Sequence, residues 1–160
     1  GLCYGRLDLD PVAGWQHDHS EDLAGLPRME AIVSSPASRC RVLAEFVTGS
    51  ARSIQIDPRW LELDFGDWEG RAFDDLPRAA LDAWAAAPWR FQPPGGELIE
   101  ALVQRVDDAL AALAGQAGPI LVVAHAGPIR VALGRCRGLA QSRWLDIEVP
   151  HARPIQTLIS

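Results

Sequence analysis

The sequence predicts an α/β fold with three layers, in which helices cover both faces of a mostly parallel central sheet. Short apolar segments alternate along the chain with longer helical patterns, which is the order expected of βαβ units. Residues 120–124 are apolar throughout and β-branched at three of five positions, as in a strand buried on both faces. Directly before them, residues 97–114 have the periodicity of a long amphipathic helix.

The composition narrows the class of protein. The 160 residues are 48% hydrophobic and 22% charged, as expected of one globular domain, and the net charge of −6 disfavours nucleic acid or an anionic membrane as the main partner. No apolar run is long enough to span a bilayer and no signal peptide is visible, so we expect a cytoplasmic protein. The cysteines, Cys3, Cys40 and Cys136, form no C-x-x-C pair. We therefore expect no metal site and no other cofactor.

The first third of the chain carries two strand patterns and two helix patterns. Residues 1–14 are rich in turn-forming residues and are expected to be a loop, so the domain opens without its first strand. A short helix is predicted over 18–26 and a strand over 31–35. The next helix is expected to have Ser35 as its cap, to begin at Pro36 and to run to about Val47. Residues 53–57 then have the pattern of a strand.

The middle of the chain is less regular. Residues 60–70 follow neither the helical nor the strand period and are dense in acidic, aromatic and glycine residues, which predicts a shaped loop. Residues 73–87 are expected to be helical with an interruption at Pro77, and 88–96 form a connection rich in Pro and Gly. The helix over 97–114 has one apolar stripe, made of Ile99, Leu102, Val103, Val106, Leu110 and Leu113.

The strand at 120–124 ends at a histidine, and a helical pattern follows over 127–136. Two further strands are predicted at 144–149 and 155–159. His125 is thus expected at the carboxyl end of a central strand, beside a helix N-terminus, where α/β sheets bind anionic ligands. For a lone histidine, a structural role at the strand end is the simpler alternative, so other residues must support a functional one.

Two more polar residues are expected near the same edge of the sheet. Arg39 lies on the first turns of the helix that follows the strand at 31–35, where its guanidinium can make a forked contact with phosphate. Glu62 lies among aromatic residues, which can raise the pKa of its carboxyl and keep it available as a proton donor. Taken singly, each has an ordinary alternative as a surface or structural charge.

Four sequence blocks in order resemble the histidine phosphatase superfamily, the phosphoglycerate mutase-like enzymes. They are Ser-Ser-Pro-x-x-Arg at 34–39, Glu-x-x-Phe-Gly-x-Trp-Glu-Gly at 62–70, Pro-Gly-Gly-Glu at 94–97 and His-x-Gly at 125–127. The resemblance implies a phosphoglycerate mutase-like fold and phosphoryl transfer through a phosphohistidine, without metal. It also implies that Arg39 and His125 bind the phosphoryl oxygens and that Glu62 protonates the leaving alcohol.

The segment at 1–8 is similar to that of members related to α-ribazole phosphatase of cobalamin biosynthesis. The resemblance implies a small-molecule phosphate ester as the ligand, with α-ribazole 5′-phosphate as the expected substrate. Tyr4 and Arg6 are candidates for the mouth of the substrate site.

One feature of the family pattern is missing from the sequence. The family's nucleophile belongs to an Arg-His motif at the end of the first strand, and no Arg-His pair occurs here. His17 and His19 stand in a polar stretch that we interpret as a solvated loop. We therefore expect residues 1–160 to be a single histidine phosphatase-like domain that is incomplete at its N-terminus.

Three interpretations remain open. The intact protein is either a phosphomonoesterase, a phosphoglycerate mutase, or a catalytically inactive phosphate-binding or interaction domain. The short connection at 88–96 disfavours the mutase, whose family members usually carry a longer insertion there. Without its first strand, the strand at 120–124 would have a free edge. We therefore expect residues 1–160 alone to form no phosphohistidine, and either to self-associate, for example as a homodimer, or to be marginally stable.

Overall fold

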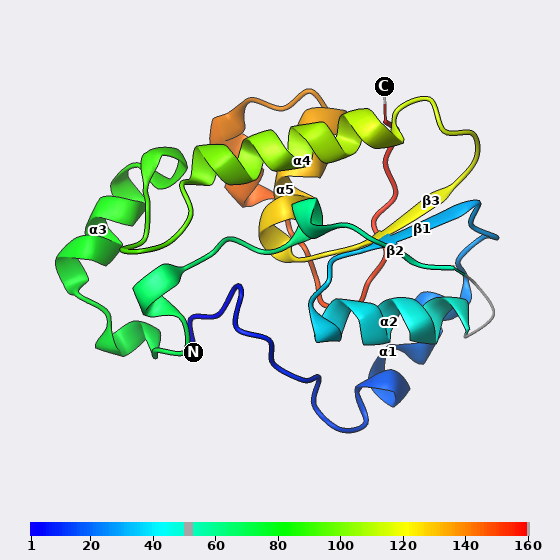
Figure 1. The fold of residues 1–160 in the computed structure, drawn as a ribbon, viewed down its shortest axis with the longest axis horizontal. Helices are drawn as coiled ribbons and strands as arrows, with labels where there is room; N and C mark the ends of the chain where they lie inside the picture. The colour runs from blue at the N-terminus through cyan, green and yellow to red at the C-terminus, as the bar shows by residue number, and fades with distance from the viewer. Residues whose placement is uncertain (50–52, 160) are drawn as a thin grey trace.

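The computed structural model describes residues 1–49 and 53–159, without the side chains of residues 18–20 and 22. Its sheet consists of strands β1 (Ala31–Ser34), β2 (Gln55–Ile56) and β3 (Ile120–Val123), in the order β2-β1-β3 (Figure 1). Both pairings are parallel, and β1 pairs with β3 from Ala31↔Ile120 to Ser34↔Val123. The prediction of a parallel α/β sheet is confirmed, and the strand ends lie at one common edge.

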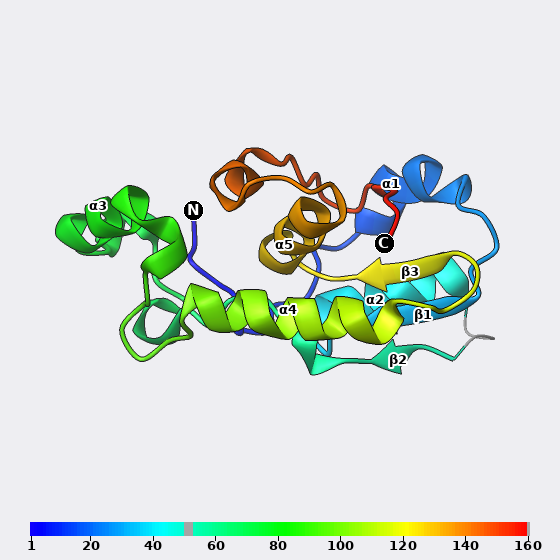
Figure 2. The same ribbon diagram turned by 90° about the horizontal axis from the view of Figure 1, so that it is seen from above.

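Helices cover the sheet on two sides (Figures 1 and 2). Helices α1 (Trp15–Ala24) and α2 (Ser38–Thr48) lie on one side, and α4 (Ile99–Leu113) and α5 (Ala126–Cys136) lie on the other. The alternation of side chains along β1 explains both layers. Ile32 packs with Cys40 and Ala44 of α2, whereas its neighbour Val33 belongs to the core beneath α4 and α5.

The larger core lies under α4. Its predicted apolar stripe is confirmed: five of the six residues are buried, and Leu110 packs half-buried against the same core. Trp60 and Trp144 close this core from the loops on either side. Complete burial of one such aliphatic side chain contributes about 1.5–3 kcal/mol, so the stripe anchors α4 firmly.

Helix α3 (Arg78–Ala86) lies at one end of the molecule, at the left of Figure 1. It begins after Pro77, and a short 3-10 helix (Phe73–Asp75) precedes the proline, as the predicted interruption requires. An aromatic group holds this end together, with Trp68 and Phe91 rings 5.3 Å apart and Trp84 stacked on Phe91 at 6.0 Å. The N-terminal segment packs against this aromatic group, because Cys3 is buried in the same cluster.

Two strand predictions near the C-terminus are wrong. Residues 141–146 form a 3-10 helix (Gln141–Asp146), and neither 144–149 nor 155–159 is a strand. Trp144 packs onto α5 at Gly134, where a Cβ atom would collide with the indole, and its Nε1–H donates to Leu139 O at 3.0 Å. The apolar pattern that suggested a strand therefore reflects the packing of this segment against α5.

Strand β3 is less enclosed than predicted. Only Val123 is buried, and Ile120, Leu121 and Val122 are intermediate, which corrects the expectation of burial on both faces. The reason is the position of β3, which is the last strand of the described sheet on its side. Among residues 1–49 and 53–159, no neighbouring strand pairs with its outer edge.

Two local predictions at the N-terminal half also need correction. Helix α2 begins at Ser38 with Ala37 as its cap, not at Pro36 with Ser35 as its cap. The Ser35 hydroxyl is engaged with His125 instead. His17 lies on α1 rather than in a loop, although it is exposed as expected, and the side chain of His19 lies outside the described residues.

Candidate functional site

Three elements bring the predicted site residues to one edge of the sheet. Arg39 lies in the first turn of α2, just after β1, and His125 lies between β3 and α5. Glu62 comes from the segment that follows β2 and reaches across to the start of α5. Because β1 and β3 run parallel and in register, the residues after them share the carboxyl edge.

His125 is enclosed at the end of β3. It is 8% exposed, and its Nε2 lies 2.8 Å from the Ser35 hydroxyl and 3.5 Å from Cys40 Sγ. Burial lowers the pKa of His125 to about 3, helped by the guanidinium groups of Arg39, Arg105 and Arg6. The imidazole is therefore neutral near pH 7, and the surrounding positive charge favours an anion beside it.

Arg39 is held by the N-terminal segment. Its Nη2 donates to Gly5 O at 2.7 Å and its Nη1 to Leu7 O at 3.0 Å. The guanidinium also lies 5.4 Å from the centre of the Tyr4 ring, within range of a cation–π contact. Asp8 completes the arrangement, because its carboxylate accepts bonds from Ser38 N and Ser38 Oγ at the start of α2.

Glu62 meets the start of α5 directly. Its Oε2 accepts a hydrogen bond from Gly127 N at 3.0 Å and its Oε1 one from Leu63 N at 2.9 Å. Burial raises the pKa of Glu62 against these hydrogen bonds and against the charges of Arg105 and Arg39. A Cβ atom at position 127 would collide with the Glu62 carboxyl, which explains why the residue two places after His125 is glycine.

The two candidates for the substrate mouth lie on the N-terminal segment beside these groups. Arg6 donates from Nε to Glu62 O at 3.0 Å and lies 3.5 Å from the Glu97 carboxylate, and Tyr4 is 40% exposed over Arg39. The Glu69 carboxylate fixes the segment by accepting bonds from the N–H groups of Gly5, Arg6 and Leu7.

Three residues that build the site were not predicted to belong to it: Ser35, Glu69 and Arg105. Ser35 and Glu69 belong to conspicuous blocks, the Ser-Ser-Pro stretch and the Trp-Glu-Gly stretch, which gave a signal for them. Arg105 has no such signal, because it stands within a helix as one of fifteen arginines.

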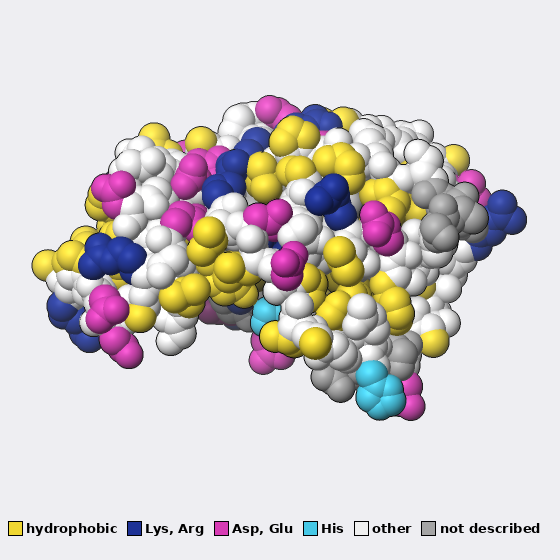
Figure 3. Space-filling view, turned by 60° about the horizontal axis from the view of Figure 1, so that its bottom comes forward, with side chains coloured by type: hydrophobic (Ala, Val, Ile, Leu, Met, Phe, Trp, Pro, Cys, Tyr) yellow, Lys and Arg dark blue, Asp and Glu magenta, His cyan; other side chains and the backbone are white. Residues whose placement is uncertain are grey.

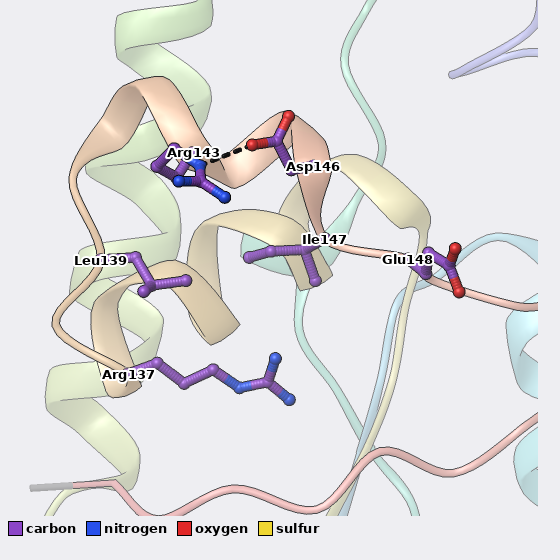
Figure 4. A pocket seen from close by; sticks show the side chains of 6 residues that line it. All are labelled: Arg137, Leu139, Arg143, Asp146, Ile147 and Glu148. Atoms are coloured by element: carbon purple, nitrogen blue, oxygen red, sulfur yellow. Dashed lines mark hydrogen bonds and ion pairs between the residues drawn. The ribbon is translucent and has the colours of Figure 1, made fainter.

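Other candidates lie away from this edge. His151 is exposed in a turn near the C-terminus. A cavity of about 400 Å³ lies at the far end of α5, between Leu139, Arg143 and Ile147 (Figure 4). Arg39, Glu62 and His125 do not line that cavity.

The described surface carries mixed charge. On the face in Figure 3, arginine side chains alternate with Asp, Glu and apolar side chains and form no continuous basic patch. Within the described residues, no cluster of His, Cys, Asp and Glu has the arrangement of a metal site. The described helices are also each too short or too polar to cross a membrane.

Two curated phosphatases are similar to this chain in sequence. The adenosylcobalamin/α-ribazole phosphatase of Escherichia coli K12 is 30% identical over 122 residues, which cover 72% of this chain and 60% of that protein. The glucosyl-3-phosphoglycerate phosphatase of Mycolicibacterium vanbaalenii is 28% identical over 173 residues, covering 89% and 75% of the two chains. The chain thus spans about three fifths of the length of the E. coli relative.

Solved structures are similar in fold as well. A structure from E. coli K-12 assigned as an α-ribazole-5′-P phosphatase superposes with a TM-score of 0.81 at 25% identity, covering 100% of this chain and 88% of that one. A phosphoglycerate mutase from Thermus thermophilus gives 0.69 at 30% identity, covering 86% and 75%. The family model of the histidine phosphatase superfamily (branch 1) matches residues 15–156. The chain therefore belongs to the histidine phosphatase superfamily.

Proposed function

We propose that the protein containing this chain is a phosphomonoester hydrolase that works through a phosphohistidine, with α-ribazole 5′-phosphate as its substrate. The observation that carries the proposal is the placement of Glu62. A carboxyl with a raised pKa is bound to Gly127 N, within two residues of the neutral His125 and in the field of Arg39. Such a carboxyl can hold a proton for a leaving group next to an anion site.

In the first step a histidine nitrogen attacks phosphorus and the P–O bond to the alcohol breaks. Glu62 gives its proton to the departing alkoxide oxygen, which leaves as the alcohol. Arg39 and His125 donate hydrogen bonds to the phosphoryl oxygens, whose charge is stabilised in this poorly hydrated, positive surrounding. The attacking histidine belongs, by family resemblance, to an Arg-His pair that residues 1–160 do not contain.

In the second step water attacks the phosphohistidine. The ionised Glu62 takes a proton from that water, the P–N bond breaks, and inorganic phosphate is released. Glu62 thereby returns to its protonated form, so one carboxyl serves as acid and then as base. No metal or other cofactor is required by these steps.

A phosphate-binding domain without turnover is the second candidate. Within residues 1–160, Arg39 and His125 supply contacts to phosphate but no nucleophile, as a domain that only binds phosphate requires. In either case we place the protein in the cytoplasm, because the described cysteines are unpaired thiols. A homodimer that pairs through the outer edge of β3 also remains part of the proposal.

The test compares residues 1–160 with the protein expressed from the complete reading frame. Both are assayed for phosphate release from p-nitrophenyl phosphate, α-ribazole 5′-phosphate, glucosyl-3-phosphoglycerate and 3-phosphoglycerate. We expect turnover only with the complete protein, and the highest kcat/KM with α-ribazole 5′-phosphate. Binding of phosphate without turnover of any ester by either protein would instead favour the second candidate.

A further inference from the structure

Arg105 makes five hydrogen bonds near the site. It projects from α4 and is only 15% exposed. Its Nε and Nη2 bind the two carboxylate oxygens of Glu97 at 2.7 and 3.0 Å. Its Nη1 donates to Arg59 O and Leu61 O, both at 2.6 Å, and Nη2 also donates to Glu62 O at 3.1 Å. These bonds use all five N–H donors of a guanidinium.

The three carbonyl groups belong to the chain segment that leads to Glu62. This segment begins within a short 3-10 helix (Pro58–Trp60) and has no strand partner among the described residues. The guanidinium therefore supplies the backbone bonds that a sheet would otherwise supply. Glu97 also fixes the backbone after Glu62, because its Oε2 accepts a hydrogen bond from Asp64 N at 3.4 Å.

The bonds to Arg105 also keep Glu97 ionised. Burial raises the pKa of Glu97, but the bonds and charge of Arg105 outweigh it, and the pKa is lowered. A buried pair of this kind is costly to break, because one charge is then left without its partner. The segment on either side of Glu62 is thus bonded to one ionised pair, made of Arg105 on α4 and Glu97 just before α4.

We propose that Arg105 is a positioning residue that holds the backbone of Glu62 so that the carboxyl reaches the start of α5. Arg105 does not touch the Glu62 carboxyl or any reacting atom. It acts through the Glu62 carbonyl, at one end of the residue, while Gly127 N meets the carboxyl at the other end. The inference deepens the proposed function and rests on it for the acid role of Glu62.

The chain offers a matched control in Arg135. This arginine lies on α5 and makes two bonds of 2.8 Å to the Asp107 carboxylate of α4, but it is 49% exposed and, within the described part of the chain, makes no hydrogen bond to residues 59–64. Arg135→Gln therefore removes an arginine–carboxylate pair that involves α4, without removing a bond to the Glu62 segment.

The kinetic test uses Arg105→Gln, Arg105→Lys and Arg135→Gln in the protein from the complete reading frame. A misplaced acid costs most where the leaving group needs a proton. Ribose 5-phosphate serves as the ester whose alkoxide needs a proton to leave, and p-nitrophenyl phosphate as the ester whose phenolate does not. We expect Arg105→Gln to lower kcat about 30-fold with the first and less than about 3-fold with the second. Arg105→Lys keeps the positive charge but not the planar set of five N–H donors, so its kcat should lie between those of Arg105→Gln and the wild type. Arg135→Gln should match the wild type.

A double variant separates positioning from general destabilisation. When Glu62→Gln has already removed the acid, adding Arg105→Gln should lower kcat with ribose 5-phosphate less than about 3-fold further. Equal losses with both substrates, or a full additional loss in the Glu62→Gln background, would overturn the positioning role. Thermal unfolding of each variant is measured alongside.

A second measurement does not depend on turnover. Carboxyl ¹³C NMR of the protein from the complete reading frame follows the titration of Glu62, with Glu62→Gln identifying its signal. In Arg105→Gln the pKa of Glu62 should rise above that of the wild type and of Arg135→Gln, because a nearby positive charge is lost. An unchanged titration would overturn the inference. Absence of turnover in the complete wild-type protein would reject the proposed function instead, and the titration would still decide the role of Arg105.

Discussion

The two halves of the candidate site are held in place by different kinds of interaction. Ser35, Arg39 and His125 follow strands β1 and β3, whose register fixes where the strands end. Glu62 lies in a segment outside the sheet, and buried side chains hold the backbone of that segment. The strand-end half is therefore supported by the sheet and its core, whereas the loop half depends on a few polar contacts.

Two arginines show the same contrast. Arg39 bonds Gly5 O and Leu7 O, and no hydrogen bond from its other donors is found among the described residues. Arg105 has no donor left for a ligand. A buried arginine near the site can therefore bind a ligand only where the protein leaves some of its guanidinium N–H groups unbonded.

The largest effect is expected at the strand-end half. His125→Ala in the protein from the complete reading frame should lower kcat/KM by roughly 10²–10⁴-fold, because a donor to the phosphoryl oxygens is lost. The loss should be similar for good and poor leaving groups, since the phosphoryl group is common to both. Steady-state kinetics measures it, with His17→Ala as a control on the exposed face of α1. A His125→Ala enzyme with wild-type kcat/KM would contradict the assignment.

A smaller and more selective effect is expected at the loop half. Glu62→Gln should lower kcat by roughly 10²-fold with ribose 5-phosphate and much less with p-nitrophenyl phosphate, whose phenolate leaves without a proton. The ratio of the two losses is the quantity to measure. Equal losses would count against an acid role for Glu62.

Stability should depend on pH through His125. Its pKa is about 3 in the folded chain against 6.5 in a model peptide, so the unfolded chain binds the proton more readily. The stabilisation is therefore fully present above pH 6.5 and is lost as the pH falls from there toward 3. Glu62, whose pKa is raised, has the opposite dependence, with stabilisation that is lost as the pH rises through its folded pKa.

Urea unfolding of residues 1–160 at several pH values measures this dependence. His125→Asn should flatten the fall of the free energy of unfolding below pH 6.5, and Glu62→Gln should leave that fall in place. An identical fall in wild type and His125→Asn would show that another group is responsible.

The smallest effect is expected at the N-terminal segment. The Glu69 carboxylate accepts hydrogen bonds from the N–H groups of Gly5, Arg6 and Leu7. Glu69→Gln removes its charge and should lower the free energy of unfolding by about 1–2 kcal/mol. The segment also holds Arg39, so KM should rise more than kcat falls. Limited proteolysis of residues 1–14 should become faster. Unchanged proteolysis and KM would show that the segment does not depend on Glu69.

The sequence predicted the strand-end half well because its signals are local. An apolar run that stops at His125, and a strand followed by a helix that carries Arg39, both indicate the edge of a parallel sheet. The helix boundaries of α4 and α5 agree with their predictions to within about two residues.

The loop half and the C-terminal segments were harder to predict for a physical reason. The bonds from Arg105 to the Glu62 segment join residues more than 40 positions apart and leave no periodic pattern. The predicted strand at 144–149 failed because a tertiary fit, Trp144 against Gly134, determines the local structure there. The Ser35 hydroxyl likewise served His125 rather than the helix cap.

The most direct measurement of the central claim is the intact mass of the protein after incubation with a phosphoryl donor. With the complete reading frame we expect an acid-labile gain of one phosphoryl group, which decays as phosphate is released. Residues 1–160 alone should gain none, and light scattering should show whether they self-associate. A complete protein that never acquires the phosphoryl group, yet releases phosphate from the donor, would contradict a phosphohistidine route.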